Sequence, residues 1–432
     1  MSKQNIRLIK NNAIFYEQDG KHRINKTDNL FVLTHLGQLK QMEALIQLKN
    51  IKNNSLVVLY TYRNLVVPQV VHDQYSSCFK QAIFMEIPFG VNKLDFIKLY
   101  KLEKQYKNLI KFCKSSTIYL NSFEGHYAIL TSIAKSNNMK VILVEEGTAT
   151  YKLKLSNNTE SRDVEKYLDA TLLQSKFMQT VGQTQVFKKA FKFYKYNKEL
   201  YGQTKRFVND VITDEKVQKD LIKLVGTKHL KASLQPFKGF DKVYASYPEL
   251  IRDSFGVQDV DYFLIHEVTH EHAIEDAKKV IERYGITEKD TLYVSQRYHL
   301  DPEQYSKTVG SILMRITRED QKVFIKLHPK ESKKVYDAFK YLEFASNGKF
   351  IVIEDSQFLI ESVVKISKLS QLIGLTSTTL VYGSLISPNT KSISIANELI
   401  KMLPNNKENQ KGIDVIKQHL EIIRIFENIE FR

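Results

Sequence analysis

The sequence predicts an α/β protein with two Rossmann-like domains, whose parallel sheets face a central cleft. With 432 residues, the chain is longer than one ordinary hydrophobic core requires. Short β-branched runs alternate with helical stretches in two separate sets, a pattern typical of parallel sheets. Hydrophobic residues make up 43% of the chain and charged residues 26%, as in globular proteins rather than disordered ones.

The first set of strands and helices begins near residue 29. A strand, a turn at Gly37 and a helix are expected over residues 29–48. After them we expect strands over residues 55–62 and 81–90, a helix with a basic face over 95–114, a strand–loop–helix unit over 116–135 and a strand with its loop over 139–153.

The pattern becomes polar and helical over residues 156–231, where lysines and aromatic residues interleave. This stretch is either a surface for a polyanion or a membrane, or a solvated helical insertion. Strand patterns return at residues 241–247 and 261–265. We therefore assign residues 1–270 to an N-terminal domain that carries the basic insertion.

The second set follows a helix that ends at Gly285. Its strand and helix units, in chain order, cover residues 291–304, 322–332, 349–366, 369–386 and 390–399. They predict a C-terminal domain over residues 271–404. Residues 405–432 have helical periodicity, and we expect this helix to pack back on the N-terminal domain.

The chain is strongly basic, since 64 lysines and arginines against 48 acidic residues give a net charge of +16. Such an excess favours a polyanionic partner, although a lysine-rich composition alone would also produce it. No apolar run has the length of a membrane span, and the N-terminus lacks the pattern of a secretory signal. The only cysteines, Cys78 and Cys113, lie in unlike contexts, so we expect a cytoplasmic protein without disulfides.

Two metal motifs occur in contexts that argue against metal sites. His266, Glu267 and His270 have the H-E-x-x-H spacing of zinc hydrolases. However, a strand-like run leads directly into His266, and no third ligand follows at the usual spacing. The D-x-D of Asp259 and Asp261 precedes an apolar run, whereas metal-dependent glycosyltransferases carry it after a strand. We expect no metal and no cofactor, and zinc hydrolysis stays as a remote alternative.

Three segments place reactive side chains at the ends of predicted strands, where ligands bind open α/β sheets. In the first, Glu145 and Glu146 follow an apolar strand and precede a turn at Gly147. Adjacent carboxylates repel, which raises the proton affinity of one of them and suits a general base. A solvated turn would have the same sequence.

The second segment ends in Lys326, His328, Pro329 and Lys330. Proline restricts the preceding histidine, so one imidazole is held among positive charges. This imidazole could donate a proton to a departing phosphate oxygen, or it could be a structural histidine at a strand end.

The third segment opens a helix with Thr376, Ser377, Thr378 and Thr379 after an apolar strand. Hydroxyl groups, free backbone N–H groups and the helix dipole together make a phosphate site. An ordinary Ser/Thr helix cap would contain the same residues.

In this order, the three segments resemble the motifs of bacterial sialyltransferases of GT-B architecture, and of the capsular polysialyltransferase group in particular. Those enzymes carry a [DE]-[DE]-G motif in the acceptor domain, with an HP motif and a Ser/Thr motif in the donor domain. The matches here are Glu145-Glu146-Gly147, His328-Pro329 and Ser377-Thr378. The resemblance covers most of the chain in layout, but only these short motifs match explicitly.

The resemblance implies inverting, metal-independent transfer of sialic acid from CMP-sialic acid to the non-reducing end of a polysialic or oligosialic acceptor, as in capsule elongation. Glu145 would take the proton from the acceptor hydroxyl, and His328 would protonate or hydrogen-bond the leaving phosphate. Gln296 and Arg297 are expected to line the cleft, although Arg297 could equally be a surface charge. His126 could line the acceptor cleft, but we expect it to fill a helix start. The donor would be held by Lys326, Pro329, Glu354, Thr376, Ser377 and Thr378.

The basic insertion gains a specific role from the resemblance, because polysialic acid carries a carboxylate on every sugar. We expect the acceptor to be bound by Lys188, Lys189, Lys192, Lys195 and Arg206. The same surface could dock the protein peripherally on the cytoplasmic face of the inner membrane, beside the capsule export machinery. No nucleic-acid module appears, so nucleic acid is not an expected partner.

Besides the remote zinc hydrolase, two alternatives stay open at this point. One is a sialyltransferase that caps lipooligosaccharide with a single sugar. The other is a non-catalytic protein that binds a polyanion.

Overall fold

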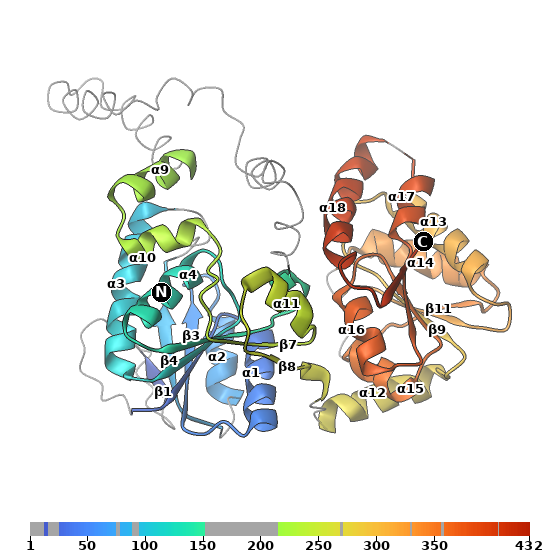
Figure 1. Ribbon diagram of the computed structural model, residues 1–432. Coiled ribbons are helices and arrows are strands. Elements are labelled where there is room, and N and C mark those ends of the chain that lie inside the picture. Colours follow the sequence, from blue (N-terminus) through green and yellow to red (C-terminus); the bar gives the residue numbers. More distant parts are fainter. Residues whose placement is uncertain are drawn as a thin grey trace, which may run out of the picture. The chain divides into compact units, whose positions relative to one another are not determined.

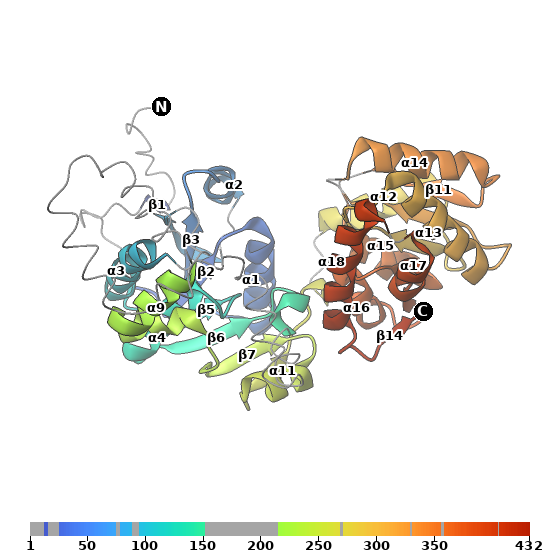
Figure 2. The ribbon, with the colours of Figure 1, turned by 90° about the horizontal axis from the view of Figure 1, so that it is seen from above.

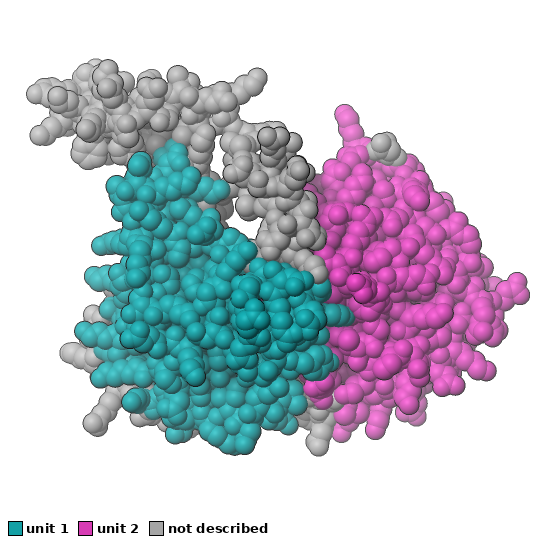
Figure 3. All heavy atoms as spheres, in the orientation of Figure 1, with its two compact units in different colours: residues 1–146, 156–263 teal, residues 147–155, 264–432 magenta. Residues whose placement is uncertain are grey.

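The structure is a computed structural model that describes residues 13–15, 26–74, 78–88, 95–151, 215–267, 271–328, 331–355, 358–404 and 406–432. The chain divides into two compact units, which Figure 3 marks by colour. Unit 1 consists of Met1–Glu146 and Ser156–Phe263, and unit 2 consists of Gly147–Leu155 and Leu264–Arg432.

Unit 1 contains an eight-stranded parallel sheet in the order β1-β4-β3-β2-β5-β6-β7-β8 (Figure 1). Its strands are rich in Val, Ile and Leu, and most of their side chains are buried, as expected for a sheet covered on both faces. The strands are β1 (Ala13–Phe15), β2 (Asn29–Leu33), β3 (Asn54–Tyr60), β4 (Phe79–Glu86), β5 (Thr117–Leu120), β6 (Lys140–Val144), β7 (Lys242–Ala245) and β8 (Val260–Tyr262).

Helices cover both faces of this sheet. Figure 2 shows α1 (Leu36–Lys49) and α2 (Val66–Gln74) on one face, and α3 (Phe96–Cys113) and α4 (His126–Ser136) on the other. The ends of α3 show why the sequence folds this way. Asp95 accepts a hydrogen bond from the Lys98 backbone N–H at 3.0 Å, and Lys114 ends the helix in the left-handed conformation.

Among the described residues, the remaining helices of unit 1 are α9 (Glu215–Val225), α10 (Lys228–Lys231), the 3₁₀ helix η2 (Ala232–Leu234) and α11 (Pro248–Phe255). The end of the predicted helical insertion is therefore helical, while residues 152–214 lie outside the described residues. Cys113 is buried at the end of α3, and neither it nor Cys78 forms a disulfide.

Unit 2 contains a six-stranded parallel sheet in the order β11-β10-β9-β12-β13-β14. Counted along the chain, this is the strand order 3-2-1-4-5-6 of Rossmann folds. Its strands are β9 (Thr291–Val294), β10 (Val323–Lys326), β11 (Phe350–Val352), β12 (Gln371–Gly374), β13 (Lys391–Ser394) and β14 (Ile429–Phe431).

The helices of unit 2 pack in two groups, α13 with α14 and α17, and α12 with α15 and α16. The α-helices are α12 (Glu271–Tyr284), α13 (Pro302–Ile316), α14 (Lys333–Ala345), α15 (Ile360–Ser367), α16 (Thr378–Ile386), α17 (Ala396–Met402) and α18 (Lys407–Ile423). Two 3₁₀ helices, η1 (Thr148–Tyr151) and η3 (Ile265–Glu267), also belong to this unit.

Apart from the edge strand β1 of unit 1, the direction of the strand order reverses once in each sheet. In unit 1 the reversal lies between β2 and β5, and in unit 2 it lies between β9 and β12. At such a switch point, connections leave the sheet in opposite directions and open a crevice beyond the carboxyl ends of the strands. The two parallel sheets with their helices confirm the predicted GT-B-like α/β class, while the predicted cleft between the domains stays a prediction.

The structure divides the chain differently from the predicted domains. Unit 2 begins at Leu264 rather than at residue 271, and it includes Gly147–Leu155. Residues 406–432 are part of unit 2, because β14 pairs with β13 and α18 packs on α17. The contact is close at Gly412, where an added Cβ would lie 2.5 Å from the His299 carbonyl oxygen. The predicted packing of this segment on the N-terminal domain stays a prediction.

Candidate functional site

The two carboxylates of the acidic pair have different surroundings, and the first of them is buried. Glu145 is 5% exposed, and its backbone N–H donates to the Tyr244 carbonyl at 2.9 Å. Its carboxylate accepts hydrogen bonds from the Ser246 backbone N–H at 2.5 Å and from Ser246 Oγ at 2.7 Å and 2.9 Å. The parallel pairing of β6 with β7 brings these partners together. Glu145 is thus a carboxylate anchored at the strand end.

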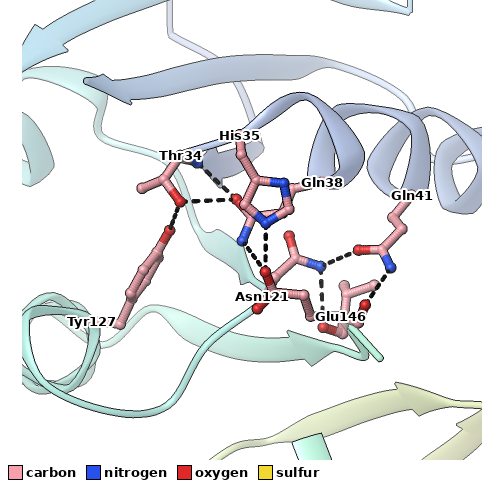
Figure 4. A network of polar contacts seen from close by, with 8 residues as sticks. Thr34, His35, Gln38, Gln41, Asn121, Tyr127 and Glu146 are labelled. Carbon is pink, nitrogen blue, oxygen red and sulfur yellow. Dashed lines mark hydrogen bonds and ion pairs between the residues drawn. The ribbon is translucent and has the colours of Figure 1, made fainter. Parts of the chain in front are cut away.

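The second carboxylate, Glu146, faces the start of α1 (Figure 4). Its Oε1 lies 2.5 Å from Nε2 of His35, and it accepts a hydrogen bond from Gln38 Nε2 at 3.1 Å. Gln41 Nε2 donates to the Glu146 carbonyl at 3.0 Å. The side chains of His35 and Glu146 are 48% and 32% exposed, so this pair is accessible to solvent.

A buried polar layer supports this pair. The Gln38 side chain accepts from the Thr34 backbone N–H at 2.7 Å, and Asn121 Nδ2 donates to Gln41 Oε1 at 3.0 Å. Tyr127 OH donates to Thr34 Oγ1 at 3.2 Å. Thr34 follows β2 and Asn121 follows β5, so the layer lies at the switch point of the unit 1 sheet.

The chain passes from unit 1 to unit 2 between Glu146 and Gly147. Gly147 has φ +151°, a backbone conformation that favours glycine. Within unit 2, Thr148 Oγ1 lies 3.5 Å from Thr378 Oγ1, and the Tyr151 ring packs edge-on against Phe426 at 5.2 Å. The segment after the acidic pair is therefore held beside the Ser/Thr cluster.

The Ser/Thr cluster begins α16 and includes its cap. Ser377 is the N-cap residue, and its hydroxyl accepts from the Thr379 backbone N–H at 3.3 Å. Thr379 Oγ1 donates to Glu361 on α15 at 2.8 Å. Thr378 opens the helix, where backbone N–H groups without helical partners and the helix dipole favour an anion.

Thr376, just before this helix, is buried at the switch point of unit 2. Its backbone N–H donates to Gln296 Oε1 at 2.7 Å, and its hydroxyl donates to the same oxygen at 3.1 Å. Tyr298 OH also bonds to this hydroxyl and lies 3.3 Å from Nδ1 of His419 on α18. Gln296 thus ties the end of β9 to the end of β12, while Arg297 is exposed.

The His-Pro segment follows β10. The His328 backbone N–H donates to Ser295 Oγ at 3.0 Å, and its carbonyl accepts from the Glu331 N–H at 2.9 Å. Pro329 lies outside the described residues. Because Ser295 follows β9, the pairing of β9 with β10 fixes where His328 leaves the sheet.

The two other predicted donor residues lie at the ends of β10 and β11. Lys326 is buried, and this burial lowers its pKa, while the nearby Asp355 carboxylate opposes the shift. Its ammonium group lies 5.3 Å from the centre of the Phe358 ring. Glu354 is exposed and accepts hydrogen bonds from Lys340 at 3.1 Å and Tyr336 at 3.2 Å, which lower its pKa.

The predicted site residues form two sets, one in each unit. Glu145 lies in unit 1, whereas Lys326, His328, Glu354 and the Ser/Thr cluster lie at the carboxyl ends of strands in unit 2. The predicted acceptor-binding residues, Lys188, Lys189, Lys192, Lys195 and Arg206, lie outside the described residues.

Sequence reasoning missed several residues of the site, namely His35, Gln38, Gln41, Ser246, Tyr298 and His419. A signal for the first of these exists, because His35 follows the apolar run of β2 as Glu145 follows β6. His126 begins α4, as expected for a helix start. Its Nδ1 accepts from Tyr106 OH at 2.7 Å, and burial lowers the pKa of His126 to about 4.

The described residues of the two metal motifs lie in a short 3₁₀ helix and beside a lysine. His266 and Glu267 lie in η3, a 3₁₀ helix that ends before α12, and His270 is outside the described residues. Asp259 and Asp261 both pair with Lys242, at 2.9 Å and 3.0 Å. No cluster of three metal-ligating side chains occurs in the part of the chain that the structure describes. Within that same part, no helix combines the length and the apolar character needed to cross a bilayer.

The solved structures that the chain resembles are distant in sequence. The chain resembles a UGT transferase from Siraitia grosvenorii in complex with UDP, with 10% identity, a TM-score of 0.48 and coverage of 92% of this chain and 93% of that chain. It also resembles a UDP-GlcNAc 2-epimerase from Neisseria meningitidis bound to UDP-GlcNAc, with 10% identity, a TM-score of 0.47 and coverage of 92% and 93%. The comparison with curated proteins gives no match.

The match to a protein family is more direct. Residues 29–396 match the family described as alpha-2,8-polysialyltransferase (POLYST). The matched range includes β2 with His35, the acidic pair, the His-Pro segment and the Ser/Thr cluster. It confirms the resemblance and the glycosyltransferase activity predicted from the sequence. The chain belongs to the alpha-2,8-polysialyltransferase family, whose members transfer sialic acid to polysialic acid.

Proposed function

We propose that this glycosyltransferase extends polysialic acid in α2,8 linkage by an inverting, metal-independent displacement, with CMP-sialic acid as the donor. The observation that carries the proposal is the start of α16, where Ser377 and Thr378 stand at the switch point of the unit 2 sheet. Hydroxyl groups and backbone N–H groups at a helix N-terminus suit the single phosphate of a nucleoside monophosphate sugar. A diphosphate, which commonly needs a bridging cation, is absent from this donor.

The reaction forms one bond and breaks one bond at C2 of the donor sialic acid. The acceptor hydroxyl oxygen attacks C2 as the bond from C2 to the phosphate oxygen breaks, and CMP leaves with the electron pair. A base in unit 1 takes the hydroxyl proton, and Glu145 is the residue that the sequence predicts for this role. His328 donates a proton or a hydrogen bond to the departing phosphate. A single displacement inverts the configuration at C2.

The donor is held by residues of unit 2 in this proposal. Thr376, Ser377 and Thr378 bind the phosphate. The hydrogen bond from the Thr376 backbone N–H to Gln296 holds Thr376 in place. Glu354 accepts hydrogen bonds from the ribose hydroxyls, and its contacts with Lys340 and Tyr336 hold the carboxylate charged for this purpose. Lys326 and Pro329 complete the site around the base and the phosphate.

The acceptor is held by positive charge. The net charge of +16 favours a chain with one carboxylate per sugar, and the basic residues of the insertion are the proposed contacts. We place the enzyme in the cytoplasm, where capsule polysaccharide is elongated, with the basic surface docked on the anionic inner membrane beside the export machinery.

The experiment is incubation with CMP-sialic acid and a fluorescent oligosialic acid primer in excess EDTA, read by product length. We expect a ladder of products from the wild type and none from His328→Ala. A single addition would instead indicate a capping sialyltransferase. Activity that appears only after zinc is added would overturn the proposed metal independence. Binding of the oligosialic acid primer without turnover of CMP-sialic acid would overturn the proposed catalytic activity.

The linkage and the stereochemistry are read from the same product. We expect α2,8 linkages in its NMR spectrum, and a first-formed product of inverted configuration at C2 relative to the donor. A retained configuration would contradict the single displacement.

A further inference from the structure

We propose that His35 is the catalytic base of this enzyme and that Glu146 orients it. The inference rests on the proposed function and deepens it, since it names the group that takes the proton from the acceptor hydroxyl. It also separates the roles of the acidic pair, in which Glu145 anchors the strand end and Glu146 serves the histidine.

The geometry of the pair is that of a carboxylate-oriented imidazole. Nε2 of His35 lies 2.5 Å from Glu146 Oε1, which fixes the Nε2–H tautomer and leaves Nδ1 to accept a proton. Although His35 is the N-cap residue of α1, its side chain makes no cap hydrogen bond. Gly37 borders the free edge of the ring, since an added Cβ would lie 3.3 Å from Nδ1. A side chain at position 37 would therefore press against the ring edge that carries Nδ1.

The surroundings hold the pair rigidly while leaving it accessible. Gln38 and Gln41 bind the side chain and the carbonyl of Glu146, and Asn121 binds Gln41 in turn (Figure 4). Gln38 and Asn121 are each only 2% exposed, whereas the side chain of His35 is 48% exposed. A base needs this combination of fixed orientation and open access to the proton donor.

The position in the sheet supports the same role. His35 follows β2, which borders the switch point of unit 1, where ligands of open α/β sheets bind. Glu145, in contrast, is 5% exposed, and both oxygens of its carboxylate already accept hydrogen bonds from Ser246. A carboxylate used in this way is less available to a substrate hydroxyl.

The proton path balances within the proposed reaction. As the new C2–O bond forms, the acceptor hydroxyl proton moves to Nδ1 of His35. The resulting imidazolium keeps its Nε2–H bonded to the Glu146 carboxylate, which stabilises the positive charge. After the product leaves, the imidazolium returns its proton to water. CMP departs with the bonding electrons of the broken C2–O bond, so no other reactant is needed.

The test is imidazole rescue of a His35→Ala variant in the primer extension assay. A positioned base contributes on the order of 10²–10⁴-fold to the rate, so we expect a loss of that size. Added imidazole should raise the rate of primer extension by the variant at least tenfold, because it can occupy the exposed space left by the ring. His229→Ala is the matched control, since this half-buried histidine of α10 bonds Ser132 and should behave as the wild type.

Binding of CMP, measured by calorimetry, separates the two proposals. CMP affinity equal to the wild type in His35→Ala, with lost transfer and imidazole rescue, supports His35 as the base. Transfer within about threefold of the wild type, or a loss that imidazole does not restore, would overturn it. If the wild type itself fails to bind CMP or to transfer in EDTA, the proposed function fails instead.

Discussion

At the scale of single residues, Glu145 and Glu146 are neighbours in sequence but not in environment. Glu145 is buried and anchored to Ser246 on the neighbouring strand connection, whereas Glu146 is partly exposed and paired with His35. Two carboxylates with different surroundings generally have different tasks in catalysis. The assignment of structural anchor to Glu145 and partner of the base to Glu146 follows from this difference.

The anchor is tested by the Ser246→Ala substitution. It removes the hydroxyl contacts to the Glu145 carboxylate and retains the backbone N–H bond. Because a buried charged acceptor loses a donor, we expect the free energy of unfolding to fall by about 1–3 kcal/mol. Urea denaturation measures this loss.

The double variant Ser246→Ala/Glu145→Gln is the control for this interaction. If the two side chains are coupled, the losses of the single variants will not add. Strictly additive losses would show that the contact contributes nothing to stability.

His126 predicts a specific pH dependence of stability. Burial lowers its pKa from 6.5 to about 4, so below pH 6.5 the unfolded chain binds a proton that the folded chain does not. The free energy of unfolding is therefore unaffected by this histidine above pH 6.5. It falls as the pH drops from 6.5 towards 4, by up to about 3 kcal/mol. Denaturation midpoints measured between pH 4 and 7 test this expectation.

The matched variant is His126→Asn, whose Oδ1 can still accept the hydrogen bond from Tyr106 OH. Asparagine does not titrate in this range, so its stability curve should fall less steeply below pH 6.5. Parallel curves for the wild type and the variant would rule out the buried imidazole as the cause.

At the scale of elements, hydrophobic patterns predicted the strand–helix units because parallel strands buried on both faces form short continuous apolar runs. The pairing of His35 with Glu146 was not predictable in this way. The two residues are 111 positions apart, and only the placement of β5 between β2 and β6 sets the distance. Local patterns contain no such information.

The C-terminal end of the chain shows the same limit of prediction from local patterns. The periodic run at the end of the chain predicted a helix, and α18 confirms it. β14, however, has only three residues, and its pairing with β13 depends on the whole sheet rather than on its own sequence. The positions of the three predicted segments at strand ends could be read from the sequence because each follows a strand directly, while their function stays a prediction.

The connection between β9 and β12 gives an element-scale prediction. Gln296→Leu keeps the volume but leaves the buried Thr376 N–H and hydroxyl without this acceptor. We expect the end of β12 to shift and the Kd for CMP to rise about five- to tenfold, equivalent to about 1–1.4 kcal/mol. Calorimetric titration with CMP provides the measurement.

An exposed glutamine on α18 offers the comparison for this experiment. Gln410→Leu removes only a bond to Asp414 on the same helix and should leave the affinity for CMP unchanged. An unchanged Kd in Gln296→Leu as well would mean that the tie between the two strands does not shape the donor site.

At the scale of the whole molecule, the excess of positive charge predicts a salt dependence that differs between substrates. Raising the salt concentration from about 50 to 300 mM shortens the range of electrostatic attraction, so primer elongation should slow several-fold. Hydrolysis of CMP-sialic acid without primer depends on local contacts at α16 and should change little. Both rates can be followed in one assay series, and an equal salt sensitivity would contradict a basic acceptor surface.

Because the chain crosses from unit 1 to unit 2 between Glu146 and Gly147, recombination between related sequences is constrained. Each unit is built from two separate stretches of sequence, because Gly147–Leu155 belongs to unit 2 although it is flanked by unit 1. A hybrid joined only near residue 263 would therefore combine η1 of one parent with α18 and the Ser/Thr helix of the other. An exchange of the whole of unit 2 requires that the nine residues 147–155 are exchanged with it. Natural or engineered chimeras in this family should have three junctions rather than one.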